Sequence, residues 1–204
     1  MDKDTPITIS RGNIKLGNIP SFSLLPGATC SARARKTCFL DGCYAVNYCK
    51  FRPSVAAAYA KNTAMAKTHL SSVVDQLSKF LGRSSVELFR VHVGGDFFSP
   101  GYFNAIMSLA RKHRKTTFLA YTKQFDNINL LEVPKNFNLV LSVWDDVKEL
   151  GPFARAGIPK AYVINPGDKI PTLEPTIVCP GDCTVCKACF SLKATRASVA
   201  FHKH

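Results

Sequence analysis

Several features common in other protein classes are missing from this sequence. It has no run of about 18 apolar residues, which argues against a bilayer-spanning helix. Residues 1–6 are polar and lack the apolar stretch of a secretory signal. No P-loop, nucleophile-elbow or zinc-protease motif occurs, so these common catalytic classes have no support. We therefore expect a cytoplasmic protein with no membrane partner.

Acidic residues are scarce. The 14 Asp and Glu face 27 Lys and Arg, which leaves a formal net charge of +13. Such an excess favours polyanionic partners, because basic side chains release counterions from phosphates. The basic residues are scattered, with local clusters at 33–36 and 111–115. Non-specific binding to nucleic acid is therefore one interpretation, and a solvated positive surface is the other.

The cysteines are grouped. The 204 residues and 46% hydrophobic composition fit one domain over residues 1–204. Its eight cysteines fall into two sets separated by about 130 residues without a cysteine. In a reducing cytosol, clustered thiols are better explained as metal ligands than as disulfides. The two sets are Cys30, Cys38, Cys43 and Cys49, and Cys179, Cys183, Cys186 and Cys189.

The second set has the more regular spacing. It reads Cys179-x3-Cys183-x2-Cys186-x2-Cys189. Three thiolates at Cys-x2-Cys-x2-Cys are typical of a [4Fe–4S] cluster, whose fourth ligand often comes from elsewhere. Structural zinc more often uses two Cys-x2-Cys pairs separated by a dozen or more residues. An iron–sulfur cluster is therefore the leading interpretation, with zinc and unliganded thiols as alternatives.

The first set, Cys30-x7-Cys38-x4-Cys43, needs an ordered loop to bring its thiolates together. Cys49 is either a further ligand or a small buried apolar residue. Two assemblies agree with the cysteine count. Both loops contribute ligands to one shared cluster, or each loop holds a cluster of its own.

Hydrophobic periodicity predicts an α/β protein. We expect helices at 100–113, 127–131 and 148–156, one long helix or two over 54–81, and five strands at 21–25, 86–93, 117–121, 139–143 and 161–164. This alternation favours an open, partial parallel β/α barrel of about five strands, with a doubly wound sheet as the alternative. In either fold, ligands bind at the carboxyl ends of the strands. The cysteine-rich loops after the first and fifth strands, and Gly94-Gly95-Asp96 after the second, would converge there.

Four stretches and the last three cysteines carry a resemblance to a known family. The stretches are residues 12–24, 29–45, 89–97 and 120–123, which together span most of the chain. They resemble a bacteriophage family known as gene product eighty-eight, which is cysteine-rich and has no assigned activity. The resemblance implies a protein that acts in the cytoplasm of the host cell.

The chain is also distantly similar to radical S-adenosylmethionine enzymes. These enzymes have a three-cysteine loop after the first strand, with an aromatic residue beside the last cysteine, as Tyr44 adjoins Cys43. Their Gly-Gly-acidic turn after the second strand contacts the cofactor, which implies that Gly94, Gly95 and Asp96 bind S-adenosylmethionine. The first loop departs from the expected Cys-x3-Cys-x2-Cys, a spacing found instead at Cys179, Cys183 and Cys186.

Two functional hypotheses follow from these patterns. The first is a [4Fe–4S] protein with a redox or regulatory role, or with divergent radical S-adenosylmethionine chemistry on an unknown small-molecule substrate. The alternative is a zinc-stabilised module that binds nucleic acid through its positive charge.

Overall fold

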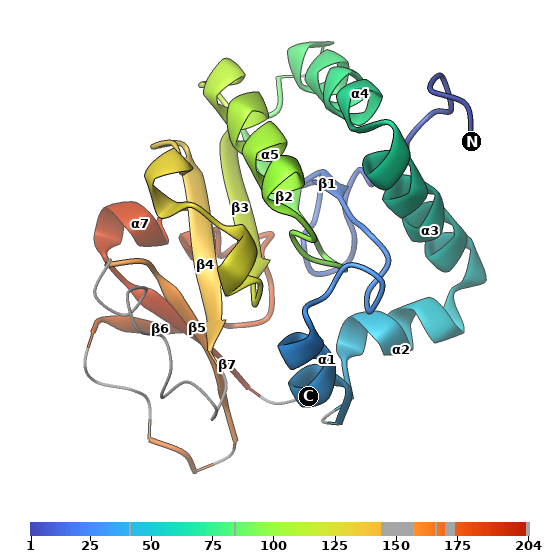
Figure 1. Ribbon diagram of the computed structural model, residues 1–204. Coiled ribbons are helices and arrows are strands. Elements are labelled where there is room, and N and C mark those ends of the chain that lie inside the picture. The colour runs from blue at the N-terminus through green and yellow to red at the C-terminus, as the bar shows by residue number, and fades with distance from the viewer. Residues whose placement is uncertain (41, 84, 144–156, 166, 170–173, 203–204) are drawn as a thin grey trace.

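The computed structural model describes residues 1–40, 42–83, 85–143, 157–165, 167–169 and 174–202. Within these residues, seven parallel strands form one open sheet in the order β1-β2-β3-β4-β5-β7-β6 (Figure 1). The strands are β1 (Ser21–Phe22), β2 (Leu88–Val91), β3 (Thr117–Thr122), β4 (Phe137–Val143), β5 (Lys160–Ile164), β6 (Thr176–Val178) and β7 (Ser198–His202).

Most of the described helices precede β3 in the sequence. They are α1 (Ala32–Leu40), α2 (Tyr44–Phe51), α3 (Pro53–Thr68), α4 (Leu70–Arg83), α5 (Pro100–Lys112) and α7 (Leu192–Thr195), with 3-10 turns η1 (Phe125–Asn127), η2 (Leu130–Glu132) and η4 (Ala188–Phe190). The longest, α3, has 16 residues, and none of the described helices combines the length and apolarity of a membrane span.

Local sequence accounts for α4 and α5, two of the helices that cover the sheet. Helix α4 buries Val73, Leu77 and Leu81, whose spacing of four residues places them on one helix face. Helix α5 begins at Pro100, and the side chain of its N-cap Ser99 accepts a hydrogen bond from the Tyr102 backbone N–H at 3.2 Å.

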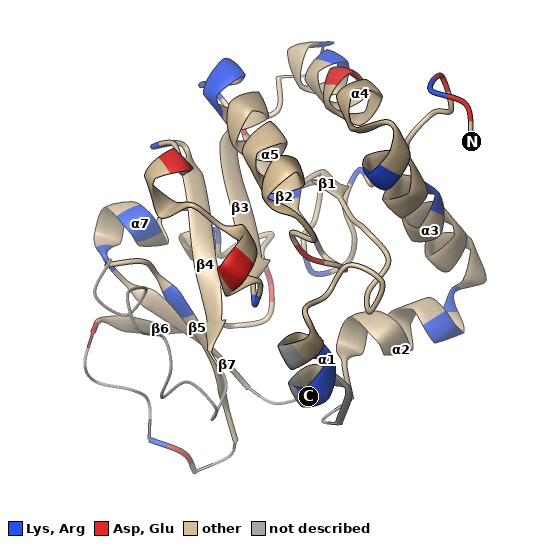
Figure 2. Cartoon of the chain, viewed as in Figure 1, with Lys and Arg blue, Asp and Glu red and all other residues tan. Residues whose placement is uncertain are grey.

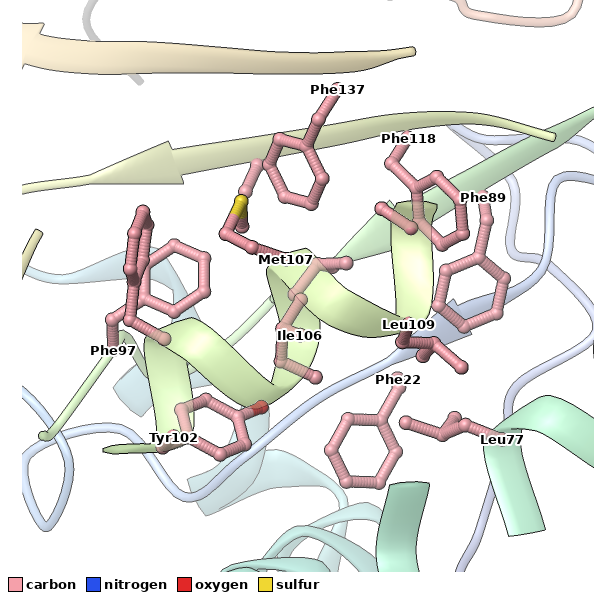
Figure 3. Packing of buried hydrophobic residues seen from close by; sticks show 14 of the residues in the cluster. Phe22, Leu77, Phe89, Phe97, Tyr102, Ile106, Met107, Leu109, Phe118 and Phe137 are labelled. Carbon is pink, nitrogen blue, oxygen red and sulfur yellow. The ribbon is translucent and has the colours of Figure 1, made fainter. Parts of the chain in front are cut away.

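The main core lies between the sheet and helices α3, α4 and α5 (Figure 3). Phe89, Phe118 and Phe137 of three neighbouring strands point to this side, and the Phe118 and Phe137 rings stack with centroids 5.8 Å apart. Met107 of α5 and Leu77 of α4 pack against the same side. Burial of these large side chains supplies most of the hydrophobic stabilisation that holds α3–α5 on the sheet.

Strand order explains why the last described part of the chain covers the other face. Strands β1 to β5 are adjacent in sequence order, so their right-handed crossovers lie on one face of the sheet. The connection from β6 to β7 runs in the opposite direction along the sheet, so the same handedness sends residues 179–197 to the other face. There Phe190 and Leu192 pack on Leu119 of β3 and Val140 of β4.

The expected open parallel α/β sheet is confirmed. Strands β1 to β5 follow one another across the sheet in sequence order, whereas a doubly wound sheet reverses its strand order partway across. The expected number of strands was too small, because β6 and β7 extend the sheet to seven. The second cysteine loop accordingly follows β6 and not the fifth strand. The stretch 54–81 forms two helices, and the helix expected at 148–156 lies outside the described residues.

Candidate functional site

The carboxyl ends of β1, β2 and β3 meet around one buried carboxylate, that of Asp96. Its Oδ1 accepts hydrogen bonds from the Thr122 hydroxyl at 2.6 Å and the Phe97 N–H at 2.8 Å. Its Oδ2 accepts one from the Lys123 N–H at 2.8 Å. The Asp96 N–H donates to the Thr29 hydroxyl oxygen at 3.2 Å. Asp96 therefore connects the loops that follow the three strands.

Burial has the largest effect on the pKa of this carboxylate. It raises the pKa of Asp96 from 3.8 to about 6, although the hydrogen bonds from Thr122, Lys123 and Phe97 act in the opposite direction. An acid with this pKa exchanges its proton near neutral pH. Such tuning is common at functional sites and also occurs in structural networks.

The two glycines before Asp96 allow close backbone approach. Gly95 has a φ of +81°, and a Cβ there would lie 2.6 Å from Thr29 Oγ1 and 2.7 Å from Leu24 Cβ. A Cβ at Gly94 would come within 3.0 Å of the Tyr59 ring. Glycine is therefore required at residue 95, where the second strand turns against the loop after the first.

His92, just before this turn, has a φ of +63°, which is uncommon for a residue with a side chain. Its Nε2 forms a hydrogen bond with the Tyr102 hydroxyl at 2.8 Å, and its ring packs edge-on against Phe97. Burial lowers the pKa of His92 to about 3, and the nearby positive charge of Arg90 acts in the same direction. The imidazole is therefore neutral at physiological pH.

The first cysteine set lies in a helical segment next to this polar centre, where the sequence suggested a loop. Cys38 belongs to α1, Cys43 is the N-cap residue of α2, and Cys49 lies within α2. Cys30 Sγ accepts a hydrogen bond from the Gly27 N–H at 3.3 Å.

The thiols of the first set influence one another's ionisation. Burial raises the pKa of Cys30 to about 11 despite its hydrogen bond from Gly27, and the charges of Asp96, Cys43 and Cys38 act in the same direction as burial. Burial likewise raises the pKa of Cys49, with a further contribution from Cys43. We call Cys30, Cys38, Cys43 and Cys49 the N-terminal cysteine group.

The second cysteine set lies on the sheet face opposite α3–α5. Backbone hydrogen bonds fix this loop: the Cys179 N–H donates to the Ala200 carbonyl, and the Cys183 N–H to the Lys15 carbonyl, each at 2.8 Å. Cys179, Cys183 and Cys189 are half-buried against the apolar residues of that face. We call Cys179, Cys183, Cys186 and Cys189 the C-terminal cysteine group.

Arg90 and Tyr121 lie beside the C-terminal cysteine group. The Arg90 guanidinium carbon is 4.2 Å from the centroid of the Tyr121 ring, and Arg90 Nε donates to the His92 carbonyl at 3.2 Å. Burial raises the pKa of both Cys183 and Cys189, and the positive charge of Arg90 opposes that rise at each. Arg90 therefore favours negative charge on these sulfurs.

The thiols thus gather as two groups, one at the carboxyl ends of β1 and β2 and one on the sheet face. The eight cysteines, all within the described residues, form no disulfide with one another and are partly buried. Among the residues that the structure describes, no three His, Cys, Asp or Glu side chains converge closely enough to hold a metal ion. Metal ligation by the predicted cysteines, and cofactor binding by Gly94, Gly95 and Asp96, stay predictions.

Some residues of the site were not singled out from the sequence. Thr29, Thr122 and Arg90 are ordinary residue types in or beside apolar strands, and their importance comes from contacts across strands. Arg90 offered one signal, since it is a charged residue inside the otherwise apolar strand Leu88–Val91.

These features define an open parallel α/β protein with two cysteine groups, one at the strand ends and one on a sheet face. The model of the Gene product 88 family matches residues 3–172, so the chain belongs to that family. The matched region includes the N-terminal cysteine group and the turn at Asp96, and it ends before Cys179. The C-terminal cysteine group therefore lies outside the region that carries the family assignment.

Two relatives come from mycobacteriophages. The Gene 88 protein of Mycobacterium phage D29 is 29% identical over 164 residues, which cover 74% of this chain and 68% of the relative. The Gene 88 protein of Mycobacterium phage L5 is 30% identical over 121 residues, covering 55% of this chain and 51% of the relative. The chain thus spans about two thirds of one relative and half of the other. No solved structure matches the chain.

Proposed function

We propose that this protein binds a [4Fe–4S] cluster through the C-terminal cysteine group and has a redox or regulatory role. The observation that carries the proposal is the position of four free thiols within one short loop, three of which (Cys179, Cys183 and Cys189) pack on an apolar sheet face beside Arg90. Thiolate sulfur is the ligand that iron–sulfur clusters use. The residues that would hold the cluster are Cys179, Cys183, Cys186 and Cys189.

The surroundings of these thiols suit such a group. When bound, the cluster supplies one-electron redox chemistry. A cluster with four thiolate ligands carries net negative charge, and Arg90 provides a compensating positive charge. Leu119, Val140 and Phe190 line the same face and limit access of water. Burial and nearby charge are both known determinants of cluster potential.

The alternative of a zinc-stabilised module requires a tighter arrangement of ligands. A single zinc ion gathers four ligands at one point, and the described side chains do not converge in that way. A cubane cluster binds each thiolate at a different iron and therefore keeps its sulfurs further apart. The Cys-x2-Cys-x2-Cys spacing of Cys183, Cys186 and Cys189, which is typical of a cubane cluster, is the reason for preferring the cluster over zinc as the proposed centre.

The N-terminal cysteine group supports a second candidate function, divergent radical S-adenosylmethionine chemistry. Cys30 lies within electrostatic reach of Asp96, and the turn at Gly94-Gly95-Asp96 ends β2 beside it. The Asp96 carboxylate already accepts three hydrogen bonds from the chain, so binding the amino group of a cofactor there requires rearrangement of at least one partner. Reductive cleavage of S-adenosylmethionine by the reconstituted protein tests this candidate, with Cys30→Ser as the control.

Metal analysis of matched cysteine variants tests the main proposal. The protein is purified anaerobically, and iron, sulfide and zinc are measured together with absorbance near roughly 400 nm, where thiolate-ligated clusters absorb. We expect about four irons and four sulfides per chain, lost when Cys183 and Cys186 are both replaced by serine and kept in Cys49→Ser. A colourless wild-type protein with stoichiometric zinc would refute the proposal. Iron lost only when Cys30 and Cys43 are replaced would move the cluster to the N-terminal cysteine group.

A further inference from the structure

Helix α2 exposes a row of aromatic side chains. Tyr44, Tyr48 and Phe51 follow a spacing of four and three residues, which places them on one face of the helix. Their exposed fractions are 57%, 37% and 83%. The Tyr44 hydroxyl donates to the Val93 carbonyl, which holds that ring in place while leaving much of it accessible. The Arg52 guanidinium carbon lies 4.6 Å from the Tyr48 ring centroid. We call Tyr44, Tyr48 and Phe51 the α2 aromatic row.

Positive charge surrounds this row. Lys50 and Arg52 are exposed on or directly after α2, and Arg35 and Lys36 are exposed on α1. Figure 2 shows Lys and Arg, and no Asp or Glu, on the described parts of α1, α2 and α3. In the sequence from 5 to 74, Asp41 is the sole acidic residue. The surface around the row is therefore strongly basic.

We propose that the α2 aromatic row and its basic neighbours bind single-stranded nucleic acid. Every base has a planar face that can stack on an exposed ring, and the adjacent cations can contact the phosphates. In a duplex the base faces are already stacked on one another, so exposed rings favour single strands. This function goes beyond the proposed cluster and rests on a different surface.

The exposure of Phe51 has no structural explanation of its own. Large apolar side chains on a surface are normal when they are single, whereas three aromatic rings on one helix face form a patch. The net charge of +13 complements a polyanion, and the patch lies within the most acid-poor part of the chain. Single-stranded nucleic acid is the partner that uses both the rings and the charge.

Fluorescence anisotropy with a labelled oligo(dT) of about 20 nucleotides tests the proposal, since a single strand of this length covers one such surface. The variants are Tyr48→Ala and Phe51→Ala, and Phe51→Trp tests rescue by another stacking ring. Leu131→Ala is the matched control, because Leu131 is 95% exposed on η2, away from α2. Iron content and circular dichroism confirm that each variant keeps its fold and metal.

We expect each alanine variant to weaken binding by about tenfold, with Phe51→Trp and Leu131→Ala close to wild type. Replacing Lys50 and Arg52 with glutamine should reduce the slope of log affinity against log salt by about 1.4, as for two lost phosphate contacts on a single strand. A matched dT·dA duplex should bind less tightly than the single strand. Equal binding of duplex and single strand, no effect of the two alanine variants, or no binding at low salt would each overturn the proposal.

Discussion

Replacing Asp96 with asparagine is expected to change how stability depends on pH. Burial raises the pKa of the folded-state carboxyl from 3.8 to about 6, whereas the unfolded chain exposes it to water. The folded protein therefore binds this proton more tightly than the unfolded chain. The stabilisation is fully present below the unfolded pKa of 3.8 and is lost as pH rises through about 6.

The size of the effect follows from the pKa difference. A rise of about 2 pKa units corresponds to about 3 kcal/mol in the free energy of unfolding. Relative to Asp96→Asn, wild type should thus lose about 3 kcal/mol between about pH 3 and about pH 7. A difference in the free energy of unfolding that is the same at every pH would report the altered hydrogen bonds to Thr122 and Lys123. The part of the difference that changes with pH would report the charge on Asp96.

Urea unfolding followed by circular dichroism at several pH values measures this difference. Asp126→Asn is a suitable control, because Asp126 is exposed on η1 and its replacement should give a curve parallel to wild type. If wild type instead gains stability over Asp96→Asn as pH rises, the three hydrogen bonds to the carboxylate outweigh its burial. The assignment of a raised pKa would then be refuted.

Two further predictions concern stability. Gly95→Ala should lower the free energy of unfolding by at least about 2 kcal/mol, because its Cβ would meet Thr29 and Leu24 and its φ is +81°. Gly101→Ala is the matched control: it has open space in α5 and should be neutral or stabilising by up to about 1 kcal/mol in the same urea assay. Glu174→Gln should cost about 1–2 kcal/mol at neutral pH, since Glu174 accepts from the Lys160 ammonium at 2.9 Å and the Ser198 hydroxyl at 2.6 Å. Burial raises the pKa of Glu174, but hydrogen bonds to the anion outweigh that effect and lower it. The difference in stability between Glu174→Gln and wild type should therefore shrink as pH falls below about 4. A difference that grows there would contradict this interpretation.

Local sequence was sufficient to predict the helices and strands that are marked by apolar runs or by capping residues. Strands β2 to β5 have apolar runs, and α5 has both its N-cap Ser99 and its first residue Pro100. Strands β6 and β7 were missed because they have only three and five residues, too few to show a clear periodicity. They form because β7 pairs with both β5 and β6, a contact between distant parts of the chain.

The residue types of the candidate site were visible in the sequence, whereas their arrangement was only partly predictable. Cysteine spacing indicated two groups, and the Gly94-Gly95-Asp96 turn was correctly placed at the carboxyl end of the second strand. Spacing alone did not indicate that most of the first group would lie in or at the start of helices, since three of the nine residues of α1 are basic and the apolar ones show no clear helical pattern. It also did not indicate that residues 179–197 would cover the opposite sheet face. That outcome depends on the reversed step from β6 to β7, which only strand order reveals.

The position of β7 has a consequence for how the chain acquires its structure during synthesis. Residues 198–202 follow all the other described strands in sequence, yet they pair between β5 and β6. Until the ribosome has made them, β5 has an open edge whose backbone groups can pair with another chain. Until then the cysteine loop before β7 also lacks the hydrogen bond from the Cys179 N–H to the Ala200 carbonyl of β7. Insertion of β7 between β5 and β6 therefore completes the sheet and fixes the loop that carries the four thiols in one late step.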